Sequence, residues 1–476
     1  MRVFILITLS LYLLTGCVPK IEKTDTLTNS DVNNELKKDL GNFKSSNLSL
    51  EKNWWTKFND EQLNRLLDEA LNNTPSLNIL KIRYEKAKSQ LNITKALKEP
   101  TVSIGGNVSR QRYSENYIFP APLGGNYYNL YEQALGLDYE FDFWDKNSSL
   151  IRAALNEAMA QKVYIRVKEL AISTTIVKLY DTLNYQKSKL NKFEELKKDI
   201  IEKHHILAKL HELGLANKIE INTSATSLDR VNNEIFDTKI EIENLKNSLA
   251  TIAGVMPSRI ENLKKSNSFD NYKVFVPENI HLDILSHRPE IAMQKYLLLS
   301  KEDYIQNAKA QFYPNISLSG LLGFTSFSWA SLFEKSSSVP YIGTAISLPL
   351  FDGHKREENL NVKVDDYNIQ VQQYNQSIIE AVNEVVTSLK KLELNQSKLK
   401  IQKSVLENNK KNVEIQKRIY ELGLKNKVSY IDSKIVLIND EIIKLALKNS
   451  EVNAHIDLIK AFGGGYENKG ETFDNN

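Results

Sequence analysis

Two histidines and three acidic residues are the side chains whose types and spacing could support chemistry. His204 and His211 lie seven residues apart in a helical pattern, so they would share one helix face and could bind a metal ion. The alternative is that both histidines line a helix seam or face solvent. Asp138, Glu140 and Asp142 alternate along a predicted strand, where residues two apart share a face, and could act as paired carboxylates or line water. We favour the water-facing surface for the acids and predict no metal site.

No complete catalytic motif accompanies these residues. The sequence has no phosphate-cradling glycine loop, no serine-histidine-acid spacing and no His/Cys metal pattern. It also has a single cysteine, which excludes a disulfide framework and a thiolate metal cluster. The sequence therefore predicts a protein that is not an enzyme and that uses no cofactor.

The position of the single cysteine, Cys17, is informative. It follows an apolar run over residues 3–14 and a Thr-Gly pair, so residues 1–16 read as a secretory signal peptide. The ending Leu-Thr-Gly-Cys looks like a bacterial lipobox, in which the cysteine thiol carries a diacylglycerol after cleavage. The alternative is a cleaved signal with an incidental cysteine. The run is shorter than the ~20 residues of a membrane-spanning helix.

Composition excludes several classes of protein. The net charge is +3, with 25% charged and 41% hydrophobic residues, so nothing indicates a nucleic-acid partner or a disordered chain. Only 18 glycines and 11 prolines occur in 476 residues, which favours long uninterrupted helices over many short strands and turns. We therefore predict a mainly α-helical protein.

Two nearly identical heptapeptides show that the chain is internally duplicated. ELGLANK occupies residues 212–218 and ELGLKNK occupies residues 421–427. Outward from these, KALKEPTVSIGGNVS pairs with KAQFYPNISLSGLLG, and FDFWDK pairs loosely with PLFDGHK. We expect repeats over residues 59–262 and 263–465, after a lipid-anchored extended segment over 17–58 and before a flexible tail over 466–476.

Each repeat has the same expected order: a helix, two strands, a very long helix, a Leu-Gly-Leu break and another long helix. In the first repeat the strands are expected over about 101–112 and 131–143, and the long helices over about 146–253. In the second repeat they are expected over about 313–327 and 340–351, and over about 354–462.

The long helices carry a seven-residue apolar period, which is typical of coiled coils. In the first repeat Ile176, Leu183 and Leu190 continue into Lys197, His204 and His211, so we expect a polar lower seam there. A helix from about residue 146 to 213 would be roughly 100 Å long at 1.5 Å per residue, more than a globular core needs. In the second repeat the period runs without a gap through Ile378, Val385, Leu392, Leu399, Leu406, Val413 and Tyr420.

The predicted strands alternate apolar and polar residues over about ten positions each, as strands of an outer-membrane barrel do. Val102, Ile104 and Val108, for example, alternate with polar residues. Four strands cannot close a barrel, and an open sheet edge cannot lie in lipid, so closure requires several copies of the chain. A soluble antiparallel sheet with one buried face is the alternative.

The order of these features resembles the TolC/OprM outer membrane efflux proteins, in particular their NodT-like lipoprotein branch. The resemblance rests on the lipobox, SHRPEI at residues 286–291, the AKAQFYPNISLSG segment after it, PLFDG before the second long helix, and the paired ELGL breaks. Two details depart from the family pattern, Glu290 in place of aspartate and Lys-Asn-Lys after the second break.

The resemblance implies a homotrimer in which four strands per subunit close a twelve-stranded barrel and long helices form a periplasmic tunnel. It implies an outer membrane location, lipid contact, and partnership with a periplasmic adaptor (membrane fusion protein) and an inner-membrane pump of the resistance-nodulation-division type. The expected function is the passive exit duct of a tripartite drug-efflux system. Alternatives are a channel for metal-ion efflux or type I protein secretion, or a lipid-anchored structural coiled coil.

The resemblance also assigns roles near the helix breaks. Gly214 and Gly423 can take the positive φ that ends a helix, and Leu215 and Leu424 would offer an apolar foothold for the adaptor.

Val428 and Asp432, beyond the second break, match the family's constricting apolar residue and its aspartate by position. Threefold symmetry would make them a hydrophobic ring and a ring of three carboxylates at a periplasmic gate. Thr223 is the uncharged counterpart of Asp432 in the first repeat, so one acidic ring is expected. The alternative is that Val428 packs in a seam and Asp432 is a solvated surface acid.

Overall fold

The computed structural model of the protein describes residues 18–27, 51–116, 118, 120–266, 268–269, 272 and 287–467. The predicted signal peptide, Cys17 and most of the predicted N-terminal segment and C-terminal tail lie outside these residues.

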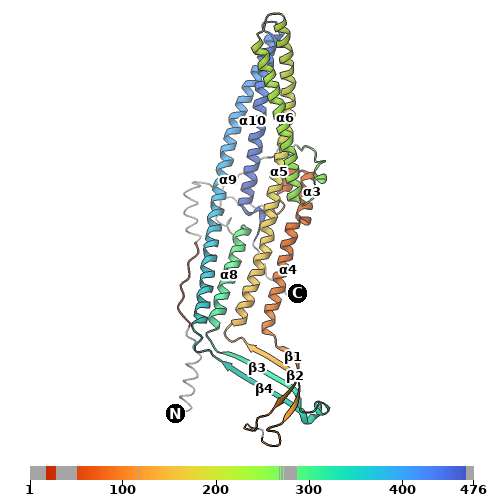
Figure 1. The fold of residues 1–476 in the computed structure, drawn as a ribbon. Helices are drawn as coiled ribbons and strands as arrows, with labels where there is room; N and C mark the ends of the chain where they lie inside the picture. Colours follow the sequence, from red (N-terminus) through yellow and green to blue (C-terminus); the bar gives the residue numbers. More distant parts are fainter. Residues whose placement is uncertain are drawn as a thin grey trace. The chain divides into compact units, whose positions relative to one another are not determined.

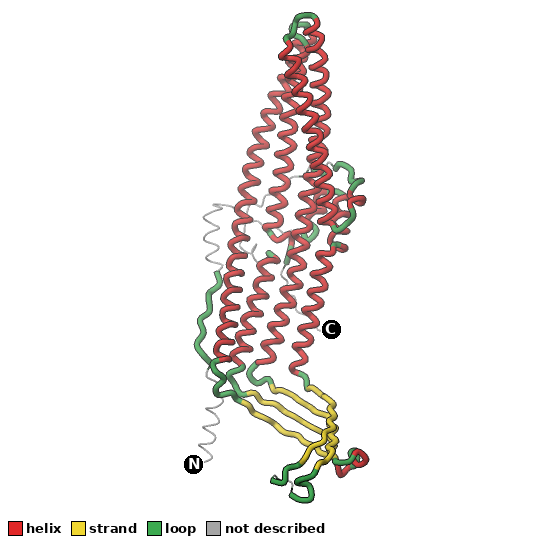
Figure 2. The backbone as a smooth tube through the Cα atoms, in the orientation of Figure 1, coloured by secondary structure: helices red, strands yellow, loops and turns green. Residues whose placement is uncertain are grey.

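The described residues are mainly helical with four strands, which confirms the predicted fold class (Figures 1 and 2). The first half contains α3 (Glu61–Asn73), α4 (Pro75–Lys95), β1 (Thr101–Arg112), β2 (Tyr127–Phe141), α5 (Lys146–Glu212) and α6 (Lys218–Ala253). The second half contains α7 (Pro257–Ile260), α8 (Pro289–Ala310), β3 (Asn315–Ser326), β4 (Ser338–Ser347), α9 (Lys355–Glu421) and α10 (Lys427–Ala461).

Several predicted strand limits were wrong. The second strand begins at Tyr127, four residues before the predicted start, because Tyr127 pairs with Arg112 at the end of β1. The second strand ends at Phe141 because the next residue, Asp142, leaves the sheet and accepts hydrogen bonds from the backbone N–H groups of Asn147 (2.9 Å) and Ser148 (2.7 Å) at the start of α5. The fourth strand ends at Ser347, two residues before Pro349, which has no N–H to donate to a strand ladder.

The chain forms two compact units, and each takes segments from both halves of the sequence. The sheet unit comprises the described residues of Met1–Thr26, Arg83–Gln161 and Gln294–Tyr374. The helix unit comprises the described residues of Leu27–Ile82, Lys162–Met293 and Asn375–Asn476.

The sheet unit contains one antiparallel sheet in the order β1-β2-β3-β4. Its register puts Val102, Leu137, Gly320 and Ile342 in one row, and Ile104, Leu135, Leu322 and Pro340 in another row of the same face. This apolar face is open, with Val102 67%, Ile104 70% and Ile342 74% exposed. A sheet whose apolar face was buried by its own chain, the alternative from the sequence, does not fit these exposures.

The opposite face of the sheet is polar. Asp138 pairs across the sheet with Ser319, whose hydroxyl donates to the Asp138 Oδ1 atom at 3.0 Å. Asn107 Nδ2 donates to Glu132 Oε2 at 3.1 Å. Among the described strands β1 pairs only with β2 and β4 only with β3, so both outer edges lack a partner.

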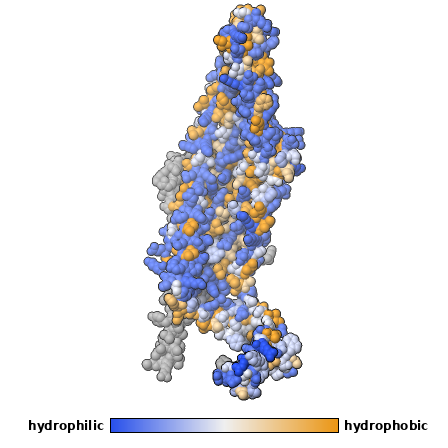
Figure 3. Space-filling view, in the orientation of Figure 1, coloured by the Kyte–Doolittle hydropathy of each residue, from blue (hydrophilic) through white to orange (hydrophobic). Residues whose placement is uncertain are grey.

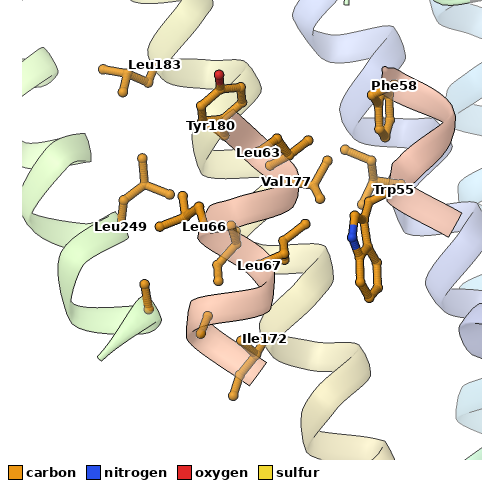
Figure 4. Packing of buried hydrophobic residues seen from close by; sticks show 14 of the residues in the cluster. Trp55, Phe58, Leu63, Leu66, Leu67, Ile172, Val177, Tyr180, Leu183 and Leu249 are labelled. Carbon is orange, nitrogen blue, oxygen red and sulfur yellow. The ribbon is translucent and has the colours of Figure 1, made fainter. Parts of the chain in front are cut away.

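The core of the helix unit packs α3 against α5, α6 and α10 (Figure 4). Leu63 and Leu67 of α3 are fully buried, and Tyr180 and Leu249 reach the same cluster from α5 and α6. Asp60 begins α3 by accepting hydrogen bonds from Gln62 N (3.0 Å) and Leu63 N (3.1 Å). Its Oδ2 atom also accepts from the Tyr180 hydroxyl at 3.1 Å, so one buried carboxylate fixes α3 to α5.

The predicted polar lower seam of α5 was wrong. The buried apolar residues beyond Leu190 are Phe193 (7% exposed), Leu196 (4%), Ile200 (4%) and Leu207 (5%), and three of them continue the seven-residue series of Ile172 and Leu179. A coiled coil has two apolar seam positions in each heptad, and in α5 the predicted seam position turns polar while the other stays apolar. Phe193 and Ile200 pack with Ile235 of α6 and Ile438 of α10.

Candidate functional site at the two helix turns

The α5–α6 and α9–α10 turns of the helix unit have the same backbone geometry. Gly214 (φ +71°) and Gly423 (φ +70°) adopt the left-handed conformation that only glycine takes without strain. Leu215 N donates to Leu210 O at 2.7 Å, and Leu424 N donates to Ile419 O at 3.1 Å, as in a Schellman C-cap. Both glycines therefore end a long helix in the same way.

An asparagine starts the next helix after each turn. Asn217 accepts from Glu220 N at 2.9 Å while the Glu220 carboxylate accepts from Asn217 N at 3.0 Å, which is a capping box. Asn426 accepts from Val428 N at 3.2 Å and caps α10. These caps allow each turn to reverse the chain within a few residues.

The turns expose large apolar side chains. The exposed fractions are 72% for Leu213, 72% for Leu215, 66% for Leu422 and 71% for Leu424. Nothing in the described chain covers these leucines, and apolar side chains grouped at one end of a helix bundle are typical of a contact surface. We call these four residues the leucine tip.

Asp432 forms an ion pair that the sequence did not reveal. Its Oδ1 atom lies 2.6 Å from the Lys203 Nζ atom of α5, and the Asp432 side chain is half exposed. Val428, one turn before it on α10, is half-buried. Asp432 therefore faces α5 and is charge-compensated within its own chain.

Lys203–Asp432 belongs to a series of ion pairs between α5 and α10. Lys434 Nζ lies 2.5 Å from Asp199 Oδ1, and Lys192 Nζ lies 2.7 Å from Glu441 Oε2. The series continues with Lys427–Glu202 and Lys178–Asp457.

The carboxylate of Glu202 accepts a hydrogen bond from Lys427 and raises the pKa of that lysine. When the sequences of α5 and α10 are aligned antiparallel, a lysine of one helix lies opposite an acid of the other at each of these pairs. This charge complementarity could have predicted from the sequence that α5 and α10 are neighbours.

The two histidines make ordinary hydrogen bonds. His204 Nδ1 lies 2.7 Å from the Ser224 hydroxyl, and His211 Nδ1 lies 2.8 Å from the carbonyl oxygen of Ala216. Over the part of the chain that the structure describes, no three His, Cys, Asp or Glu side chains form a group that could hold a metal ion. His204 thus connects α5 to α6, and His211 connects the end of α5 to the turn that follows it.

The three strand acids also have structural partners. Glu140 pairs with Lys146 at 2.8 Å. Burial raises the pKa of Asp142, but hydrogen bonds from Ser148 and Asn147 and the nearby Lys98 charge outweigh this and lower it. The arrangement is a capped helix start and not a pair of catalytic carboxylates.

The Arg-Pro-Glu-Ile motif connects α8 to α9 and α10 inside the helix unit. The buried Arg288 donates from Nη2 to Glu384 Oε2 at 2.5 Å, and Lys460 Nζ lies 3.5 Å from the other oxygen of Glu384. Burial raises the pKa of Glu384, but these two cations outweigh it and lower the pKa. The motif is therefore a buried structural anchor.

None of the helices in the described ranges is long and apolar enough to cross a membrane.

Comparisons with known proteins agree with this architecture. The outer membrane efflux protein family matches residues 66–255 and 282–464. The multidrug resistance outer membrane protein MdtP of Escherichia coli O6:H1 is 26% identical over 432 residues, covering 87% of this chain and 86% of MdtP. The probable efflux pump outer membrane protein TtgC of Pseudomonas putida is 25% identical over 425 residues, covering 88% of this chain and 87% of TtgC.

Two solved structures share the fold. The outer membrane protein VceC of Vibrio cholerae superimposes with a TM-score of 0.80 at 25% identity, covering 88% of this chain and 100% of VceC. The CmeC outer membrane channel of Campylobacter jejuni gives a TM-score of 0.80 at 25% identity, covering 96% of both chains. The chain therefore belongs to the outer membrane efflux protein family and is an outer membrane efflux channel.

Proposed function

We propose that the protein is the exit duct of a tripartite drug-efflux system and works as a homotrimer with a periplasmic adaptor and an inner-membrane pump. The observation that carries this proposal is the four-stranded sheet with an open apolar face and two unpaired edges. Unpaired backbone groups cannot remain in lipid, so the edges must pair with other copies of the chain. Three copies supply twelve strands, enough to enclose a pore.

Drugs are the proposed cargo because relatives carry names that refer to multidrug resistance and antibiotic efflux. The polar strand face, with Asp138 and Glu132, would line the water-filled pore. The pump of the resistance-nodulation-division type supplies the energy, since a passive duct has none of its own.

Deletion of the gene tests this function. Loss of the duct should raise the intracellular level of a fluorescent pump substrate, and the full-length gene on a plasmid should restore the wild-type level. An unchanged level in a strain that lacks its other outer-membrane ducts would contradict the proposal.

We also propose that Cys17 carries the lipid anchor of this channel. Val18 and Ile21 pack on Ile305 of α8 and Leu360 of α9 in the sheet unit, close to where those helices join the strands. Lys23 pairs with Glu302 at 3.0 Å. The described start of the chain thus lies beside the strand ends, where an acyl chain could enter the membrane.

An asparagine ladder on α9 supports this path. Thr24 N donates to Asn368 Oδ1 at 2.9 Å, and Leu27 N donates to Asn375 Oδ1 at 2.9 Å. The two asparagines are seven residues apart on the helix, which corresponds to a rise of about 10.5 Å. Thr24 and Leu27 are three residues apart in an extended segment, which corresponds to about 10 Å, so the two spacings match. Residues 24–27 therefore keep a fixed register along α9.

Cys17→Ser should abolish metabolic labelling with palmitate, because the hydroxyl cannot form the thioether of the diacylglycerol. Labelling followed by gel autoradiography measures this, with the wild type as the positive control. If the substituted protein is still labelled, the anchor lies elsewhere.

A further inference from the structure

We propose that Arg110 and Arg112 bind the phosphate groups of an anionic glycolipid in the outer leaflet of the outer membrane. The proposal rests on the placement of the sheet in that membrane, with its apolar face toward lipid. Both residues lie at the end of β1 next to the β1–β2 loop.

The strand register places both arginines on the apolar face. The β1–β2 ladder is unbroken from Thr101 to Arg112, so Arg110 and Arg112 follow Val108 on the same side. Arg110 lies opposite Asn129, and Arg112 lies opposite Tyr127, which is 64% exposed. The polar face is occupied by other residues at this level, because Gln111 Nε2 donates to the Tyr113 hydroxyl at 2.8 Å.

An aromatic cluster marks the boundary of the apolar face near these arginines. The Trp329 ring lies 5.7 Å from the Tyr131 ring and 6.3 Å from the Phe333 ring, and Phe333 lies 5.8 Å from Phe324. Trp329 is 61% exposed and Phe333 60%. Aromatic girdles of this kind lie at the membrane–water interface of barrels, so the arginines lie at head-group level.

The hairpin end of the sheet faces the cell exterior. The other end of each strand continues into α4, α5, α8 or α9, and under the proposed function these helices extend toward the periplasmic adaptor. Figure 3 shows strongly hydrophilic residues gathered at the hairpin end. The head groups at this level are those of the outer leaflet, where phosphorylated glycolipid is the anionic component.

The two guanidinium groups differ in their partners. Arg112 donates from Nη2 to Glu115 Oε1 at 3.1 Å and from Nε to the Gly125 carbonyl at 3.1 Å, which fixes its position. The exposed Arg110 has no ion-pair partner among the residues that the structure describes. The planar guanidinium group of Arg110 can therefore donate two parallel hydrogen bonds to one phosphate. A lysine ammonium group, which acts as a point charge, cannot do this.

Location in the membrane makes a lipid phosphate the fitting partner. An arginine on the lipid face costs about 2–4 kcal/mol at the bilayer midplane but only about 0–1 near the interface. Two arginines two residues apart lie roughly 7 Å from each other along the strand and can contact one phosphorylated head group together.

Native mass spectrometry of the full-length protein, titrated with bisphosphorylated or with dephosphorylated lipid A, tests the site. Arg110→Gln should weaken binding of the bisphosphorylated lipid by about tenfold, and addition of Arg112→Gln should weaken it further. Arg110→Lys should give an intermediate loss, because it keeps the charge without the fork. Binding of the dephosphorylated lipid should not change. Arg230→Gln, on the exposed surface of α6, is the matched control.

Equal affinity of wild type and Arg110→Gln for the bisphosphorylated lipid would overturn the site. So would an equal loss for both lipids, which would indicate contact through the aromatic cluster alone. Insertion of the same preparations into phosphatidylcholine liposomes, measured by flotation, separates this from the proposed function. If the wild type does not insert, the membrane placement is wrong. If it inserts and Arg110→Gln leaves the lipid A affinity unchanged, only the glycolipid site is wrong.

Discussion

Aspartate in place of Leu215 and Leu424 should abolish drug efflux without unfolding the protein. The two leucines belong to the leucine tip and are 72% and 71% exposed, so their replacement removes little packing within the chain. In a complex each would be buried against the adaptor, and burial of a leucine contributes about 1.5–3 kcal/mol. Loss of two such contacts removes about 3–6 kcal/mol for each subunit, which corresponds to a drop in affinity of roughly a hundredfold to ten-thousandfold.

Accumulation of a fluorescent pump substrate, measured beside cross-linking of the adaptor to the channel, checks this result. Met256→Asp is the matched control because Met256 is 75% exposed in the α6–α7 connection of the helix unit. The leucine tip is not the docking surface if the double variant is expressed at the wild-type level and still exports the substrate.

Val428→Ala with Asp432→Ala should open the closed channel and weaken its block by divalent cations. We propose that the two residues form the gate, and the ion pair with Lys203 adds a second role for the acid. Removal of Asp432 eliminates three carboxylates at once, each worth about 1 kcal/mol at contact distance in water, so block should weaken at least about tenfold.

Lys203→Met separates the two roles of Asp432 in single-channel recordings. It breaks the ion pair and leaves the carboxylate ring uncompensated, so the channel should open more often while block by divalent cations becomes stronger. Asp440→Ala is a control on the same helix, because that acid accepts a hydrogen bond from Asn409 of α9 instead of pairing with α5. Wild-type conductance and block in an assembled Val428→Ala, Asp432→Ala channel would place the gate elsewhere.

The elements with a strong period were predictable from the sequence. The start of α5 at Lys146 and its end before Gly214 follow from a long helical pattern and a glycine break, and the structure has both. The alternation in β1 fixed which residues share a face, because a side-chain period of two leaves a single assignment once pairing is antiparallel. The predicted repeat boundaries stay a prediction, since the compact units divide the chain differently.

Features that depend on contacts between distant segments were missed. The Lys203–Asp432 ion pair joins helices from opposite halves of the chain, and no local pattern shows which helices are neighbours. The apolar seam through Phe193 was missed because the polar Gln186 interrupts its seven-residue series in the sequence. The asparagine ladder was missed because Asn368 and Asn375 read as ordinary surface residues until the N-terminal segment lies beside them.

The mass of the detergent-solubilised protein by light scattering tests the central claim most directly. The two unpaired sheet edges require closure by other copies, so the full-length protein should have the mass of three chains and should insert into lipid only in that form. A stable monomer that inserts into lipid bilayers and conducts ions would contradict closure of the barrel between chains.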